Sequence, residues 1–229
     1  IFLITATGLG IVAILLSLAR GSWISLILAI AIVVAFGWVK MNAVERKTYF
    51  ASMGGLALIL ALVLAPFSLK IYERLTADDE GSALIRIPLM ETALRMMKAN
   101  PIVGVGLNAY RTTMTKYDET SIFVTKVFPN PVHNLFAHIT VEIGVFGGAI
   151  FALLFVIAAY ECWLSLQSRD KLLFAFGLAG LAAIVAFVVS AIKEPGSLGS
   201  VRPPLRTCFF IFGAISAVSR VRRQYETLQ

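Results

Sequence analysis

A few ionisable side chains lie where the surrounding sequence is strongly apolar, and they are the residues best suited to chemistry. Arg20 interrupts two apolar runs, and an arginine near membrane depth usually pairs with an anion or lines a cavity. Its planar guanidinium can bind a phosphate or a carboxylate through two hydrogen bonds. The alternative is that the side chain extends to the lipid head groups at the membrane surface.

The only two histidines, His133 and His138, are five residues apart. On a helix this separation corresponds to about 140°, so the pair is unsuited to hold one metal ion. His138 and Glu142 are four residues apart and can hydrogen-bond on one helix face. His133 follows the rigid turn 129–131 (Pro-Asn-Pro), which could present it at the mouth of the fold. The alternative for both histidines is that they are interfacial polar residues satisfied by their neighbours.

Other candidate groups carry less information. Asp78, Asp79 and Glu80 offer hard oxygen atoms that suit Mg²⁺ or Ca²⁺, but adjacent carboxylates in a loop are usually only solvated, and we expect no metal site. Cys162 and Cys208 lie in apolar runs without a CxxC spacing and are interpreted as ordinary membrane cysteines. The sequence has no P-loop, GxSxG, Rossmann glycine pattern or HExxH motif.

The composition indicates what must position these groups. The 229 residues are 59% hydrophobic and 14% charged, whereas soluble domains average about 45–50% apolar and about 25% charged residues. This apolar content is enough for five or six membrane spans of ~20 residues each. It excludes a soluble globular domain, a disordered tail and a nucleic-acid module. The net charge of +7 is attributed to loops that orient the helices.

Six apolar runs predict an all-α, polytopic helical membrane bundle with about six transmembrane helices. The runs are Ile1–Leu18, Ser22–Val39, Thr48–Leu69, about Val132–Leu166, Leu172–Ile192 and Pro204–Ser219. The predicted organisation is three transmembrane helices in 1–69, a large external loop with amphipathic helices in 70–131, and three transmembrane helices with a cytoplasmic tail in 132–229. Because Ile1 already lies in an apolar run without signal-peptide features, we expect the chain to be the later part of a longer protein.

Charges in the connectors predict the orientation. Lys40–Lys47, Arg169–Lys171 and the tail from Arg220 are short and rich in bases, so they are expected on the cytoplasmic side. The opposite side then receives Arg20 and the segment 70–131.

The external segment shows its own helical pattern. Apolar residues at helical spacing from Leu84 to Met97 predict an amphipathic helix at the outer membrane interface, with Pro88 in its first turn. The helix is expected to end at Asn100-Pro101, and a turn at 104–106 leads to a second short helix in 107–117.

The fourth apolar run is too long for one span. Its 35 residues would extend about 52 Å as a straight helix, against a hydrocarbon core of ~30 Å. We therefore expect a bend at Gly144–Gly148. The bend would place His133, His138 and Glu142 beside the external helices.

Three segments in order resemble the O-antigen ligase and O-antigen polymerase superfamily of bacterial membrane glycosyltransferases. The first is Leu16-Ser17-Leu18-Ala19-Arg20-Gly21. The second begins at Arg86 and continues into Asn100-Pro101-Ile102-Val103-Gly104-Val105-Gly106. The third is His133-Asn134-Leu135-Phe136, leading through Glu142-Ile143-Gly144 to Gly147. The resemblance covers about residues 13–155.

The resemblance implies a multi-pass enzyme of the bacterial inner membrane with its active site facing the periplasm. Its donor would be a glycan linked to undecaprenyl pyrophosphate, and its acceptor a hydroxyl of lipid A-core, of a growing glycan or of a protein. By motif match, Arg20 and Arg86 would bind the pyrophosphate and His133 would be the general base, with Asn134, His138 and Glu142 in support. The resemblance further implies a metal-independent, inverting transfer without a cofactor, with membrane lipids as surroundings and no nucleic-acid partner.

Two alternatives remain open at this point. The same arginines could form the binding site of a transporter or flippase for an anionic lipid-linked glycan. Transporters favour sites at the bilayer midplane, in broken helices, whereas the charged candidates here gather toward one face. The second alternative is a structural membrane subunit.

Overall fold

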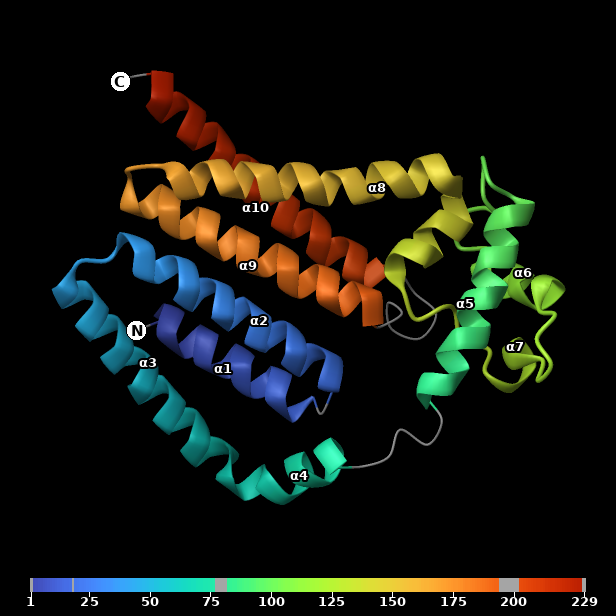
Figure 1. The fold of residues 1–229 in the computed structure, drawn as a ribbon, viewed down its shortest axis with the longest axis horizontal. Helices are drawn as coiled ribbons and strands as arrows, with labels where there is room; N and C mark the ends of the chain where they lie inside the picture. Colours follow the sequence, from blue (N-terminus) through green and yellow to red (C-terminus); the bar gives the residue numbers. More distant parts are fainter. Residues whose placement is uncertain (1, 18, 77–81, 194–201, 228–229) are drawn as a thin grey trace. The chain divides into compact units, whose positions relative to one another are not determined.

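The computed structural model describes residues 2–17, 19–76, 82–193 and 202–227, and every regular element in these ranges is a helix (Figure 1). The predicted all-α class is therefore confirmed for this part of the chain. The chain divides into two compact units, Ile1–Asp78 and Asp79–Gln229. The acidic residues 78–80, considered above for a metal, lie outside the described residues.

The first unit consists of helices joined by tight connections. Its elements are α1 (Phe2–Leu16), α2 (Arg20–Gly37), α3 (Ala43–Leu64) and α4 (Ser68–Thr76), with short 3-10 helices at Trp38–Lys40 and Ala65–Phe67. The indole Nε1 of Trp23 donates to the carbonyl of Leu15 at 3.2 Å, which ties α2 to the end of α1. Asn42 and Glu45 form a reciprocal capping box, so α3 begins at Ala43, before the predicted start at Thr48.

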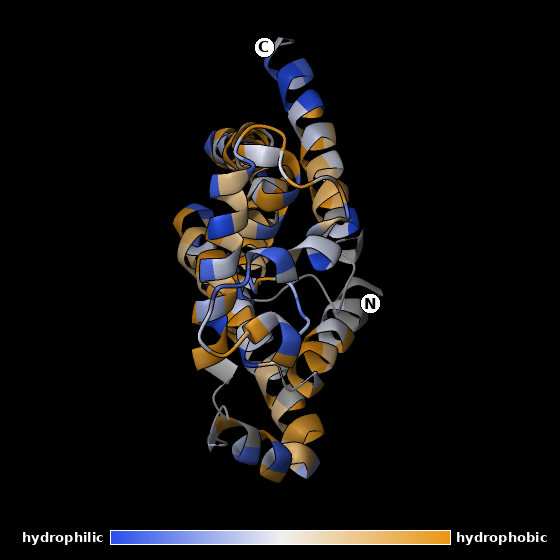
Figure 2. Ribbon diagram, turned by 90° about the vertical axis from the view of Figure 1, so that its right-hand side faces the viewer, coloured by the Kyte–Doolittle hydropathy of each residue, from blue (hydrophilic) through white to orange (hydrophobic). Residues whose placement is uncertain are grey.

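The second unit contains α5 (Ser82–Ala99), α6 (Tyr110–Thr113), α7 (Val124–Val127), α8 (Leu135–Gln167), α9 (Lys171–Lys193) and α10 (Arg202–Thr227), with a 3-10 helix at Met114–Tyr117. Helices α8, α9 and α10 pack around the ring of Phe155, whose centroid lies 5.5 Å from that of Phe187 and 4.9 Å from that of Phe212. Figure 2 shows that α10 changes along its length, from apolar turns to a hydrophilic C-terminal end. The second unit thus has an apolar helical bundle as its base.

Four stretches of the described chain are long and apolar enough to cross a membrane: Arg20–Lys40, Ala43–Glu73, Leu135–Gln167 and Lys171–Lys193. These match the second, third, fourth and fifth predicted spans. The first predicted run forms the 15-residue α1, and the sixth forms part of α10, which carries charged residues near both ends. A membrane-embedded helical protein is therefore supported, and the count of six spans stays a prediction.

The segment between α4 and α8 differs from its sequence prediction in one place. Pro88 lies inside α5 and not in its first turn, because the helix already begins at Ser82. A proline has a helical φ and sacrifices only one hydrogen bond, here the one to the carbonyl of Leu84. Beyond it, Leu89, Ala93 and Met96 are fully buried, and their packing holds the helix together. The predicted end near Asn100 is confirmed, and the second short helix begins at Tyr110.

The predicted bend in the fourth run is confirmed. Gly144 interrupts α8 with φ 76° and ψ 174°, values that no α-helix contains. Figure 1 shows the change of direction, which brings the first part of α8 toward α5. Val141 and Glu142 of this part contact residues of α5 and α6. The bend thereby separates a membrane-length segment from a shorter one that belongs to the site described next.

Candidate functional site

The interruption at Gly144 leaves backbone N–H and carbonyl groups of α8 without partners in the helix, and the loop 101–106 forms hydrogen bonds with them. In a continuous helix the N–H of Val145 would donate to Val141, but here it donates to the carbonyl of Pro101 at 2.8 Å. The carbonyls of Val141 and Glu142 accept from the N–H groups of Val105 (2.9 Å) and Gly106 (3.0 Å). Three backbone hydrogen bonds therefore fasten the loop after α5 to the bend of α8. We call this arrangement the backbone clasp.

Two glycines make the backbone clasp possible. Gly144 has φ +76°, and a Cβ there would lie 2.0 Å from the carbonyl oxygen of Ile102. Gly104 has φ +74°, and a Cβ there would lie 2.4 Å from the carbonyl of Glu142. Both the left-handed backbone and the close approach exclude other side chains. The sequence segments around these two glycines therefore form one structural feature, because the backbone of residues 101–102 approaches Gly144 and the backbone of residues 141–142 approaches Gly104.

A small apolar core lies beneath the backbone clasp. It is formed by side chains of α5, α6, the 3-10 helix after α6, the segment before α8 and the first part of α8. Its fully or nearly buried members are Ala93, Met96, Tyr110, Met114, Val132 and Val141. This core gives a fixed shape to α5, α6, α7 and the first part of α8, which we call the outer part of the second unit. A site needs such a support if its side chains are to be held in place.

Tyr110 connects three parts of this core. Its hydroxyl accepts from the N–H of Val132 at 3.3 Å, its own N–H donates to the Glu142 carboxylate at 3.3 Å, and its ring stacks on that of His138 with centroids 4.7 Å apart. Nε2 of His138 lies 3.3 Å from Oε1 of Glu142, which confirms the predicted pairing of these residues. Burial raises the pKa of the Tyr110 hydroxyl, so it stays protonated. Tyr110 thus fixes the backbone directly before His133.

Arg111 holds the turn that leads to His133. Its guanidinium donates from Nε (3.2 Å) and Nη2 (2.8 Å) to the carbonyl of Pro129, and from Nη2 to Oδ1 of Asn130 (3.2 Å). Together with Tyr110, it ties the segment 129–132 to α6. The approach to His133 is therefore restrained by two neighbouring side chains.

The loop between α6 and α7 is organised by a buried carboxylate. Asp118 accepts from the N–H and hydroxyl groups of both Thr120 and Thr125, at distances from 2.5 to 3.0 Å. Burial alone raises the pKa of Asp118, but these hydrogen bonds outweigh it and lower the pKa to about 2. Asp118 is therefore ionised at all physiological pH values and stabilises the loop.

His133 lies at the edge of this assembly, in the loop before α8, and is half-buried. Its Nδ1 is buried and has no hydrogen-bond partner among the described residues. Burial lowers the pKa of His133, and the positive charge of Arg86 on α5 lowers it further. The imidazole is therefore neutral at neutral pH and able to accept a proton.

The structure brings some of the predicted site residues together. Arg86 is near enough for its positive charge to lower the pKa of His133, and both residues belong to the second unit. Asn134 is the N-cap of α8, where its side chain accepts from the N–H of Ala137 at 3.0 Å.

His138 and Glu142 are buried, so they support the site from within. Arg20 is the first residue of α2 and half-buried; it belongs to the first unit.

The sequence does not predict the parts played by Tyr110, Arg111 and Asp118. Tyr110 and Arg111 contact residues 18 to 32 positions further along the chain, and no periodicity connects such partners. The turn at Asp118 could have been predicted from the local sequence, because an aspartate followed by a threonine two positions later is typical of a turn capped by the aspartate side chain. Among the described residues, no group of three or more potential ligands is arranged to hold a metal ion.

Comparison with known proteins identifies the family to which this chain belongs. The family model described as O-antigen ligase matches residues 5–152, about two thirds of the chain, and the chain therefore belongs to the O-antigen ligase family. The family is one of glycan transfer in membranes, with a lipid-linked glycan as the class of substrate. The match includes Arg20, Arg86, His133 and the backbone clasp. A search of curated proteins finds no match.

The contact between Tyr110 and Val132 leads to a first prediction. Replacing Tyr110 with phenylalanine keeps the ring but leaves the buried N–H of Val132 without an acceptor, which costs about 1–3 kcal/mol. We expect the segment before His133 to shift and glycan-transfer turnover to fall about tenfold or more. The matched control is Tyr225→Phe in α10, whose ring is half exposed. Equal turnover of both variants would show that the tyrosine hydroxyl does not position His133.

Proposed function

We propose that this protein transfers a glycan from an undecaprenyl-pyrophosphate-linked donor to an acceptor hydroxyl at the periplasmic face of the bacterial inner membrane. The acceptor would belong to lipid A-core, to a growing glycan or to a protein. The observation that carries the proposal is that the half-buried His133 lies on a rigid support within reach of the positive charge of Arg86, which together with burial lowers the pKa of the imidazole. A proton acceptor near a positive charge suits a reaction in which a hydroxyl attacks and an anion leaves.

In this mechanism His133 accepts the proton of the acceptor hydroxyl as the oxygen attacks the anomeric carbon of the donor sugar. The new carbon–oxygen bond forms as the bond to the pyrophosphate oxygen breaks, so the configuration at that carbon inverts. Undecaprenyl pyrophosphate leaves with the electron pair of the broken bond. Arg86, together with Arg20, neutralises the charge that develops on it. No metal ion or cofactor takes part in the proposed transfer.

The effect of Arg86 on His133 would also couple binding of the donor to the strength of the base. Without donor, the charge of Arg86 lowers the pKa of His133. A pyrophosphate bound to Arg86 would offset this charge and raise the pKa of the imidazole again. His133 would therefore be a better proton acceptor when the donor is present than when the site holds no anion.

Turnover in detergent tests the proposal. The full-length protein, purified in detergent, is mixed with an undecaprenyl-pyrophosphate-linked glycan and its acceptor, and we expect released undecaprenyl pyrophosphate and a glycosylated acceptor with inverted anomeric configuration. Mass spectrometry measures both products, and NMR of the product gives the configuration. A transporter needs two compartments and would produce neither in detergent. A protein that inserts normally and yet forms no product with any of the three acceptor classes would contradict the proposal.

A further inference from the structure

A second polar assembly lies between α8 and α10, at the opposite end of α8 from His133. The carboxylate of Glu161 accepts from the hydroxyl of Ser219 (2.6 Å), from Nη2 of Arg222 (2.9 Å) and from Nη2 of Arg223. Arg222 also pairs with Glu226 at 2.9 Å. The carboxylate of Glu161 therefore accepts from three donors of α10, and the two helices are held together at this end.

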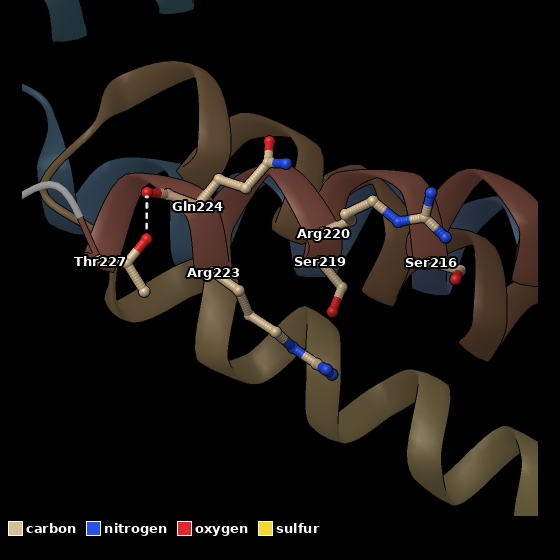
Figure 3. A pocket seen from close by; sticks show the side chains of 6 residues that line it. All are labelled: Ser216, Ser219, Arg220, Arg223, Gln224 and Thr227. Atoms are coloured by element: carbon tan, nitrogen blue, oxygen red, sulfur yellow. Dashed lines mark hydrogen bonds between the residues drawn. The ribbon is translucent and has the colours of Figure 1, made fainter.

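A pocket of about 350 Å³ adjoins this assembly on α10 (Figure 3). It is lined by Ser216, Ser219, Arg220, Arg223, Gln224 and Thr227. Figure 3 shows that Arg223 extends across toward the neighbouring helix, whereas Arg220 extends along α10. Arg220 is exposed and makes no hydrogen bond or ion pair among the described residues. The lining therefore combines hydroxyl and amide groups with two arginines and contains no carboxylate, a composition that suits an anion.

A second pocket, of about 340 Å³, continues from the first along the groove between α8 and α10. The two share Ser216, Ser219 and Arg223. The second is also lined by Glu161, whose carboxylate is already paired with Arg223, and otherwise mainly by apolar side chains such as Leu154 and Phe209. Each volume is in the range of small-molecule sites. The joined groove therefore has a basic end and an apolar end.

The order of these ends matches the polarity of a membrane lipid. The basic end lies at the hydrophilic C-terminal end of α10, which Figure 2 shows. The apolar end follows α8 into its membrane-length segment, where the ring of Phe155 packs on that of Phe212. From Arg220 to Phe209 the groove extends about 16 Å along the helix. An occupant with an anionic head and a hydrocarbon chain would thus meet matching chemistry at both ends.

We propose that this groove binds an anionic phospholipid, with its phosphate on Arg220 and Arg223 and an acyl chain between α8 and α10. The occupant contacts neither Arg86 nor His133 and is distinct from the donor. Bound there, it links α10 to α8 at the end of the bundle where the Glu161 assembly already joins them.

Native mass spectrometry of the full-length protein tests the groove. The protein is purified in micelles containing equal amounts of phosphatidylglycerol and phosphatidylcholine, and we expect it to retain phosphatidylglycerol selectively. Arg220→Gln removes an arginine without breaking any described contact, and it should reduce the retained phosphatidylglycerol about fivefold. Arg206→Gln, on the same helix but outside both pockets, should leave retention unchanged. Ser216→Trp fills the junction of the pockets and should abolish retention, with helix content checked by circular dichroism.

Three outcomes would overturn the proposal. Equal retention of both lipids by the unaltered protein would show that the head-group charge is not recognised. Equal losses in the Arg220 and Arg206 variants would show a general attraction to α10 and not a site. Complete displacement of the lipid by inorganic phosphate would show that the apolar end of the groove contributes nothing to binding.

Discussion

Replacing His133 with glutamine is expected to lower glycan transfer by about 10²- to 10⁴-fold, the usual contribution of a general base. Glutamine has a similar size and polarity, but it cannot accept a proton near neutral pH. Because His133 is half-buried at the edge of the site and its Nδ1 has no partner among the described residues, the exchange breaks no described hydrogen bond. Single-turnover measurement of product, with membrane insertion checked on the same preparation, separates loss of chemistry from loss of protein.

If His133 is the general base, the dependence of kcat/KM on pH should follow the protonation of its imidazole. Burial and the charge of Arg86 lower the pKa of His133, so kcat/KM should begin to fall only below the ordinary histidine value of ~6.5. Arg86→Gln removes the charge and should shift this acidic limb to higher pH, in addition to weakening donor binding.

In the unaltered protein, kcat reports the donor complex, so the acidic limb of kcat should lie at higher pH than that of kcat/KM. An acidic limb that stays unchanged in the Arg86 variant would contradict the coupling, and full activity of both variants would exclude the proposed chemistry.

Alanine at Gly144 is expected to disrupt the backbone clasp and with it the whole outer part of the second unit. The added Cβ meets the Ile102 carbonyl oxygen at 2.0 Å, and alanine disfavours the positive φ of this position. The strained backbone costs about 1–3 kcal/mol, and each buried backbone group that loses its partner costs about 1–3 kcal/mol more. We expect transfer activity to disappear even though His133 and Arg86 are intact.

Limited trypsin digestion measures this disruption directly. Lys98, Arg111 and Lys116 are exposed, but they lie on or beside α5 and α6. Cleavage after them requires the backbone to unfold locally, which the separation of α5 and α6 from α8 would permit. Gly54→Ala is the matched control, because a Cβ at this position of α3 has no atom within 4 Å. Digestion of the Gly144 variant at the rate of the Gly54 variant would show that the bend tolerates a side chain and that the backbone clasp is not required.

The bend of α8 and the contact between His138 and Glu142 could be predicted from the sequence, because a single physical constraint determines each of them. The bend of α8 follows from the excess of an apolar run over the membrane thickness, and glycine was the residue type able to provide it. The pairing of His138 with Glu142 follows from helical spacing alone. The prediction for Pro88 was wrong because local preference places proline in a first turn, whereas the burial of Leu89, Ala93 and Met96 extends the helix through it.

The remaining parts of the site depend on contacts between distant segments. Tyr110 meets Val132, and Arg111 meets Pro129, across turns whose geometry no local pattern specifies. The contact between the loop at Gly104 and the bend at Gly144 is of the same kind. The sequence alone indicates a turn at each glycine, and only the fold shows that each one makes room for the backbone of the other segment. From the resemblance, Arg86 and His133 were expected to lie near each other. They do so because α5 packs against α8.

Because the backbone clasp is made of main-chain atoms, it leaves the side chains of its loop available for other purposes. Ile102, Val103 and Leu107 are 67%, 77% and 78% exposed, and none of the three hydrogen bonds that fasten the loop uses a side chain. The loop can therefore exchange its surface residues without loosening its attachment. Proteins built on this clasp would be free to diversify the surface of this loop while α5 stays attached to the bend of α8.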